Sequence, residues 1–203
     1  MKKFITLLMF VAITACNNNN TPPKIQYSAV VDADERTYSI NLDESQIVWT
    51  GREVSSSYHY GTLKFKSGDF FIINGIISSG TFIVDMNSLI NLDLEGDSKS
   101  RLEGHLRSDD FFSVDSHPDA KITINGSDKI SNGKWNVVGD LTIKNITHPI
   151  TFEMINTDKG WVIDLTFDRS KYDVKFRSGS FFENLGDKLI YDDIELSVNL
   201  ITL

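Results

Sequence analysis

The sequence predicts an all-β domain, an antiparallel barrel or sandwich of roughly eight strands or more. From Tyr38 onward, apolar residues recur with a period of two, which places them on one face of successive strands. Glycines separate these runs, as is typical of turns and bulges. The runs are not interleaved with crossover helices, which argues against a parallel α/β sheet. A barrel would also pair the edges of its Val- and Ile-rich strands.

The alternating runs follow one another along the chain, and each predicts one strand. They occupy residues 38–42, 47–49, 63–65, 82–86, 122–124, 135–143, 161–167 and 194–200. Segment 70–77 is apolar at both odd and even positions, which is typical of a strand covered on both faces and leaves its register open. Leu102, Leu106 and Phe111 have near-helical spacing, so we expect a short helix, with Ser98 as its N-cap, at one end of the barrel.

The N-terminus has the pattern of a secretory signal peptide over residues 1–15. Lys2 and Lys3 precede an apolar stretch from Phe4 to Ala15. At about 1.5 Å per residue, this stretch covers roughly 18 Å as a helix, too short for a hydrocarbon core of about 30 Å. We therefore expect the segment to direct export and to be removed.

The end of this segment, Ile13-Thr14-Ala15-Cys16, resembles the bacterial lipobox. The resemblance implies cleavage before Cys16 and acylation of that cysteine. Because two or more acyl chains hold a protein stably on a membrane, we expect a membrane-anchored lipoprotein of the bacterial cell envelope. Asn17 is not an acid, which favours the outer membrane facing the periplasm. Residues 16–36, which open on a run of Asn and then Pro, predict a flexible tether before a domain over residues 37–203.

Composition narrows the classes of partner. The chain of 203 residues carries a formal net charge of −8, so it would repel a nucleic acid. A single cysteine excludes disulfides within the chain and a zinc site of several thiolates. The histidines lack the i, i+4 spacing of a local metal pair, so no metal site is predicted. An enzyme is not predicted either, because the sequence has no Gly-x-Ser-x-Gly elbow and no phosphate-binding glycine loop.

Seven segments in fixed order resemble the YceI-like family of exported bacterial lipid-binding proteins. They occupy residues 38–40 with 47–51, 59–61, 80–89 with 93–94, 102–106 and 108–112 with 118–120, 139–144 with 147–149, 168–170, and 192–196. The resemblance spans residues 38 to 203. It implies a lipocalin-like antiparallel β-barrel of about eight strands with one or two short helices. The implied ligand of the apolar interior is a long chain such as a polyisoprenoid or an isoprenoid quinone. One departure is Tyr172-Asp173-Val174, where the family usually has glycine in the middle.

An eight-stranded barrel holds either packed side chains or one small ligand, and both interpretations stay open at this point. The first predicts a non-catalytic lipoprotein without a resident cofactor that sequesters or transports an apolar lipid, including a fatty chain. The second predicts a structural or adaptor lipoprotein with a filled barrel that acts through contacts with an unknown protein. The candidate ligand-binding wall consists of inward-facing apolar residues, namely Leu63, Phe65, Phe82, Val84, Met86, Leu141, Ile143, Trp161, Ile163, Leu165, Phe167, Leu196 and Val198.

Two polar residues complete the candidate site. His59, beside a short glycine turn, either contacts a polar headgroup or is an ordinary turn histidine. Arg169 either orients a ligand oxygen or forms an internal ion pair with a carboxylate such as Asp164 or Asp85.

Overall fold

The computed structural model describes residues 34–55 and 57–203. Cys16, the predicted signal peptide and most of the predicted tether lie outside these residues. The strands are β1 (Glu35–Ser39), β2 (Gln46–Glu53), β3 (Tyr58–Ile73), β4 (Ile76–Asn91), β5 (Asp119–Ser131), β6 (Lys134–Ile143), β7 (Ile146–Thr157), β8 (Gly160–Asp168) and β9 (Ile190–Leu200). The described helices are α1 (Gly96–Arg107) and the 3-10 helices η1 (Arg169–Tyr172) and η2 (Gly186–Lys188).

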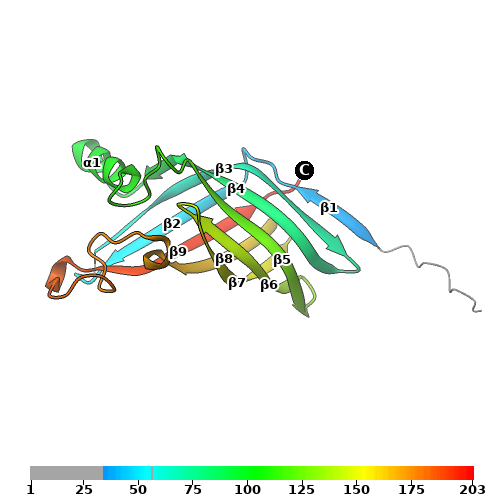
Figure 1. Cartoon of the computed structure of the whole chain (residues 1–203). Coiled ribbons are helices and arrows are strands. Elements are labelled where there is room, and N and C mark those ends of the chain that lie inside the picture. Colours follow the sequence, from blue (N-terminus) through cyan, green and yellow to red (C-terminus); the bar gives the residue numbers. More distant parts are fainter. Residues whose placement is uncertain (1–33, 56) are drawn as a thin grey trace, which may run out of the picture. The chain divides into compact units, whose positions relative to one another are not determined.

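Eight of the strands close into an antiparallel barrel (Figure 1). Around the barrel the order is β2, β9, β8, β7, β6, β5, β4 and β3, and β3 pairs with β2 to close the ring. Neighbouring strands are antiparallel throughout. Of the two predicted architectures, the structure therefore confirms the all-β barrel of about eight strands and not the sandwich. The short strand β1 extends the wall by pairing with residues 69–73 of β3.

The start of β1 lies two residues before the domain boundary that composition predicts. Glu35 and Arg36, assigned to the tether, pair with Ile73 and Ile72 of β3. The far end of β3 extends past β2 and offers its free edge to β1. This partner is distant in sequence, so the local composition of the tether does not indicate it.

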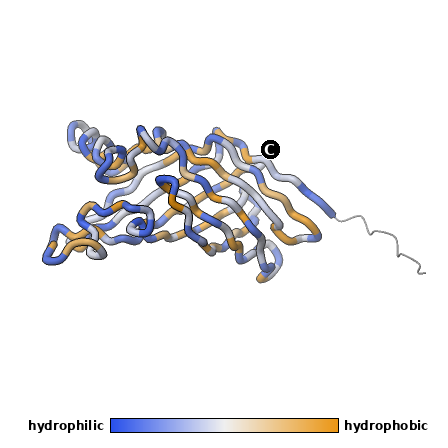
Figure 2. The backbone as a smooth tube through the Cα atoms, in the orientation of Figure 1, coloured by the Kyte–Doolittle hydropathy of each residue, from blue (hydrophilic) through white to orange (hydrophobic). Residues whose placement is uncertain are grey.

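Alternation along the strands separates the inside of the barrel from the outside. Figure 2 shows apolar and polar positions following one another along the strands. In β8, for example, buried residues alternate with more exposed ones. The four buried residues are Trp161, Ile163, Leu165 and Phe167. The buried hydrophobic residues form one cluster between Ile40 and Leu200. The barrel thus carries its own core, the property that allows a domain to fold independently.

The apolar segment 70–77 is the tip of the β3–β4 hairpin. Asn74 and Gly75 both have positive φ, 52° and 78°, as in the two-residue turns that match the twist of a hairpin. Phe70 is fully buried inside the barrel, whereas Phe71 is 38% exposed on the other face. The expectation of a strand covered on both faces is therefore wrong, because the outer face of this hairpin carries apolar side chains that remain exposed.

The predicted helix forms at one end of the barrel, but it begins earlier than expected. Glu95 occupies the N-cap position, so the predicted cap at Ser98 is wrong. Gly96 has a φ of 55°, a conformation that glycine adopts without strain, and it turns the chain into α1. At the other end of α1, Arg107 donates a hydrogen bond to the carbonyl of Leu89 in β4. In the described part of the chain, no helix is long and apolar enough to cross a membrane.

Aromatic side chains fill the end of the barrel next to β1. Tyr38 stacks on Phe70 with ring centroids 4.9 Å apart, and Phe70 meets Trp161 edge to face at 4.9 Å. The ring of Trp135 lies 5.3 Å from that of Trp161. We call Tyr38, Phe70, Trp135 and Trp161 the aromatic plug. Trp135 also donates its indole N–H to the carbonyl of Gly75, at 2.9 Å, which ties the plug to the hairpin tip.

Candidate functional site

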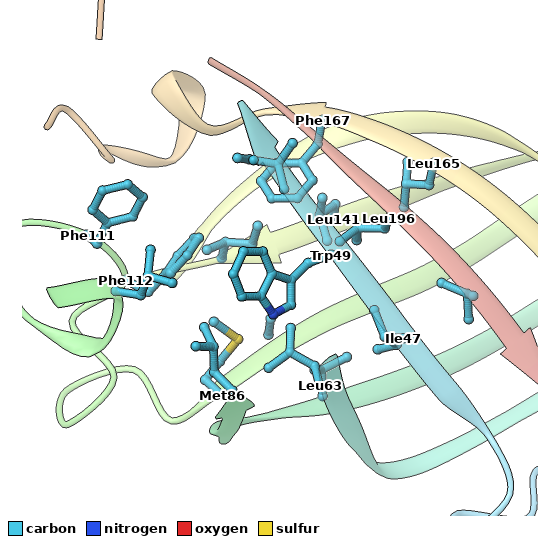
Figure 3. A pocket seen from close by; sticks show the side chains of 18 of the residues that line it. Ile47, Trp49, Leu63, Met86, Phe111, Phe112, Leu141, Leu165, Phe167 and Leu196 are labelled. Atoms are coloured by element: carbon cyan, nitrogen blue, oxygen red, sulfur yellow. The ribbon is translucent and has the colours of Figure 1, made fainter. Parts of the chain in front are cut away.

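The remainder of the barrel interior is hollow. It encloses a cavity of about 330 Å³, a volume at the lower end of the range for ligand pockets (Figure 3). Twelve of the thirteen predicted wall residues line it, together with His59; the twelve are Leu63, Phe65, Phe82, Val84, Met86, Leu141, Ile143, Ile163, Leu165, Phe167, Leu196 and Val198. The period-two pattern therefore identifies much of the wall, because side chains of one parity all point into a closed barrel.

The remaining wall residue, Trp161, does not line the cavity. It is 2% exposed and belongs to the aromatic plug, where its ring contacts Phe70 and Trp135. Alternation assigns Trp161 to the inside correctly, but it does not indicate at which level along the barrel axis side chains fill the interior. That depends on where large rings from several strands meet.

The cavity lining also includes apolar residues that are not among the predicted wall residues. They are Ile47, Trp49, Leu89, Leu102, Leu106, Phe111, Phe112, Ala120, Ile122, Phe152, Phe176, Ile190, Ile194 and Leu200. Several of them, including Trp49 and Ile194, stand in the alternating runs and could have been found from that signal. Phe111 shares the near-helical spacing of Leu102 and Leu106 but lies after the end of α1. Phe112 and Phe176 also lie outside the strands, on segments after α1 and η1, and no periodicity indicates them.

Arg169 lies outside the cavity lining and is fully buried. Its guanidinium donates to the carbonyls of Tyr191, Ile190 and Val174, at 3.2, 3.2 and 3.5 Å. Its charge partner is Asp192, whose Oδ1 lies 3.3 Å from Nη2, rather than Asp164 or Asp85. Burial lowers the pKa of Arg169, and the nearby carboxylate of Asp192 opposes that effect. These contacts connect η1 to the start of β9.

Asp192 also secures the loop between η1 and β9, which includes η2. It accepts hydrogen bonds from the hydroxyls of Ser178 and Ser180, at 2.8 and 2.7 Å. At the start of this loop, Asp173 has a φ of 60°, the left-handed conformation that favours glycine. The loop then carries Phe176 to the cavity wall.

The polar residues of the cavity lining gather mainly at the end opposite the plug. This mouth comprises Arg52, Glu53, His59, His105 and Arg177, on β2, β3, α1 and the loop before β9. Arg52 is neutralised by Glu195, which accepts two hydrogen bonds of 3.1 Å from its guanidinium. The ring of His105 packs edge to face on Phe176, with centroids 4.3 Å apart. The mouth can therefore contact a polar group while the interior contacts an apolar chain.

His59 is held in place by a network of hydrogen bonds. Its Nδ1 lies 2.7 Å from Oδ2 of Asp93, and Oδ1 of Asp93 accepts hydrogen bonds from the backbone N–H of Tyr60 and from Asn91. Burial tends to raise the pKa of Asp93, but the hydrogen bonds from these three groups outweigh it and hold the pKa below its ordinary value. An ionised carboxylate only accepts, so Nδ1 carries the hydrogen and Nε2 is left for a ligand.

We predict that Asp93→Asn lowers the free energy of unfolding at pH 7 by about 1.5–3 kcal/mol, the usual range for hydrogen bonds to a charged group. A carboxyl with a lowered pKa in the folded state stabilises the fold above its unfolded pKa of about 3.9. That contribution is lost as the pH falls through the lower, folded pKa. The difference between wild type and Asp93→Asn should therefore shrink below pH ~4, as measured by urea unfolding across pH. An equal difference at every pH, or an equal loss in the exposed control Asp34→Asn, would contradict this assignment.

No three His, Cys, Asp or Glu side chains among residues 34–55 and 57–203 come together in a way that could hold a metal ion. The features that stand out in this region are thus the apolar cavity and its polar mouth.

A closed barrel with an apolar cavity and a polar mouth defines the class of β-barrels with internal space for one small ligand. Residues 38–202 match the YceI-like domain over most of the chain, and the chain belongs to the YceI-like family. The resemblance seen in the seven sequence segments is thereby confirmed.

Among curated proteins, the chain is similar to several that are named UPF0312 protein. One from Vibrio campbellii is 31% identical over 128 residues, which cover 61% of this chain and 60% of the relative. One from Pseudomonas putida is 28% identical over 114 residues, covering 55% of this chain and 56% of the relative. The chain thus spans 60% or less of the length of these two relatives.

Two solved structures share the fold. BcnA of Burkholderia cenocepacia aligns with a TM-score of 0.57 and 17% identity, over 79% of this chain and 98% of BcnA. A polyisoprenoid binding domain from Saccharophagus degradans, implicated in plant cell wall breakdown, aligns with a TM-score of 0.53 and 14% identity, over 80% of this chain and 95% of that domain. At this level of identity the likeness establishes a common barrel.

Proposed function

We propose that the protein is a cell-envelope lipoprotein that binds a long-chain apolar ligand inside its barrel and sequesters or transports it without catalysis. The ligand would be a polyisoprenoid, an isoprenoid quinone or a fatty chain. The observation that carries this proposal is the cavity, which is lined almost entirely by apolar side chains. The polyisoprenoid binding described for the Saccharophagus degradans domain, which has the same fold, supports it.

Burial of the chain supplies the binding energy in this proposal. Each CH₂ group moved from water into an apolar environment contributes about 0.8 kcal/mol. Ten such groups contribute about 8 kcal/mol, comparable to a dissociation constant near 1 μM before the costs of ordering the ligand. Affinity then depends on the length of chain that the cavity accepts, and the polar mouth with His59 contacts the more polar end of the ligand.

The anchor would keep the cavity close to the source of its ligand. In the proposal, acyl groups on Cys16 attach the exported protein to the outer membrane, facing the periplasm, through a tether. A lipid that is nearly insoluble in water would then pass between membrane and barrel over a short distance. The mature chain is acidic, so attachment relies on the acyl groups rather than on charge attraction to an anionic surface.

Mass spectrometry of the protein purified from bacterial membranes tests both parts of the proposal. Under native conditions we expect a stoichiometric mass excess that disappears on denaturation and is recovered by organic extraction as an isoprenoid or fatty chain. Under denaturing conditions we expect a covalent mass of acyl groups at Cys16. The control Cys16→Ser should lose the covalent mass and appear as an unprocessed or soluble form.

The outcomes separate the two parts. An unmodified cysteine would contradict the anchor and leave the ligand proposal in place. A bare native mass that does not increase on incubation with quinones or polyprenols would contradict ligand binding. It would instead favour an adaptor protein that acts through protein contacts.

A further inference from the structure

One buried polar group in the cavity wall has no partner. Trp49 lines the cavity and is 8% exposed, and its indole Nε1–H has no hydrogen-bond acceptor among the described residues. The indole of Trp135, in the aromatic plug, instead donates to the carbonyl of Gly75. A buried donor without an acceptor destabilises the folded protein. Such a group therefore needs an explanation, and its position in a candidate binding cavity suggests one.

The indole of Trp49 packs against the backbone of β3 at Gly61. Trp49 in β2 pairs with Gly61 in β3, and a Cβ atom at Gly61 would come within 2.6 and 2.8 Å of Cζ2 and Cε2 of the indole. The ring therefore occupies the space that a side chain at residue 61 would fill. Figure 3 shows the nitrogen edge of the indole on the side of Met86 and Leu63, both of which line the cavity. Met86 is unbranched and adapts readily to a bound molecule.

A water molecule at this N–H would need further polar partners to be held in place. Buried waters typically need two to four polar partners to be held. Met86 and Leu63, which line the cavity, offer no oxygen or nitrogen side-chain atoms, and the carbonyl oxygen of Ile90, close to Gly61, is a single polar atom on this side of the ring. An apolar ligand that carries its own acceptor would bring both the oxygen and the carbon atoms that exclude water.

The depth of Trp49 indicates which part of a ligand would reach it. His59 at the mouth pairs with Gly51, and Trp49 pairs with Gly61, two residues further into the barrel. At about 3.3 Å per residue, the two levels differ by roughly 7 Å. The acceptor would thus lie just inside the mouth, with the hydrocarbon chain extending from there toward the aromatic plug.

We propose that the ligand is a carbonyl-bearing long-chain amphiphile and that Trp49 Nε1–H donates a hydrogen bond to its carbonyl oxygen. This inference rests on the proposed function and narrows the ligand class within it. Ketones, quinones and esters have such an oxygen, whereas a plain hydrocarbon chain does not. Trp49 is then a residue that determines specificity, in addition to forming part of the wall.

The test compares two probes on the barrel domain, residues 34–203, which carries its own core. One probe is a thirteen-carbon methyl ketone, and the other is its methylene analogue, in which CH₂ replaces the carbonyl oxygen. With ¹⁵N-labelled tryptophan, the ketone should move the Trp49 indole proton resonance downfield, and the analogue should not. The Trp135 resonance should stay in place with both probes. Trp49→Phe identifies the resonance of Trp49.

Affinities measured on the same samples give the second readout. We expect the wild type to prefer the ketone by about tenfold, the equivalent of ~1.4 kcal/mol, within the range for one hydrogen bond. Replacing Trp49 with benzothienylalanine, which has sulfur in place of N–H and nearly the same shape, should abolish the preference and leave binding of the analogue unchanged. Equal affinities for the two probes in the wild type, or equal shifts of the Trp49 resonance, would overturn this inference while apolar binding stands. Binding of neither probe would overturn the proposed function and this inference together.

Discussion

Arg169→Met is expected to lower the free energy of unfolding by about 3–5 kcal/mol, the range for removal of one partner of a buried ion pair. The guanidinium is fully buried and donates to three carbonyls, two of them at the start of β9. Its removal leaves those carbonyls without their donor and the carboxylate of Asp192 without its charge partner, because methionine fills the volume but supplies neither N–H nor charge. Urea unfolding at pH 7 measures the loss.

Two controls distinguish the buried network from a general effect of removing an arginine. Arg36→Ala deletes an exposed guanidinium that pairs with Asp34, and we expect no measurable change in the free energy of unfolding, because solvent screens an exposed ion pair. Arg169→Lys retains the charge but offers one nitrogen in place of three, so it should rescue only part of the loss. A loss below ~1 kcal/mol for Arg169→Met would contradict the structural role of this residue and reopen its assignment to the ligand.

Leu196→Trp is expected to weaken binding of an apolar fluorescent probe by about 50-fold. Leu196, on β9, is one of the residues that line the cavity (Figure 3), and it is only partly covered by protein. An indole at this position would occupy space equivalent to about three CH₂ groups of ligand, worth roughly 2.4 kcal/mol. The empty space should accept the larger ring, so the free energy of unfolding should change by less than ~1.5 kcal/mol.

The matched control is Val138→Trp, on the outer face of β6. Val138 is 43% exposed and does not line the cavity, so the same bulky residue should leave probe affinity within about twofold of wild type. Fluorescence titration gives the affinities, and urea unfolding shows whether each variant is folded. Unchanged binding by folded Leu196→Trp would mean that the ligand does not occupy this cavity.

Much of this protein follows from the order of apolar and polar residues alone. Alternation in runs such as 161–167 indicates strands, and the lack of crossover helices indicates an antiparallel arrangement. A closed ring then requires one parity to face inward, so most of the cavity wall follows from the same pattern. His59, singled out in the sequence by the nearby glycine, also lies at the cavity lining, although it stands in β3 and not in a turn.

Only the tertiary structure decided which part of the interior is filled. The rings of Tyr38, Phe70, Trp135 and Trp161 come from four different strands and meet at one height. The rings of His105, Phe111 and Phe176 also contact one another, but they line the cavity near its mouth and leave the space between them and the aromatic plug open. The pairing of Arg169 with Asp192 depends likewise on η1 lying against β9. Local patterns set the direction in which each side chain points, but packing density and charge pairing depend on neighbours that are distant in sequence, and these neighbours are determined only when the barrel closes.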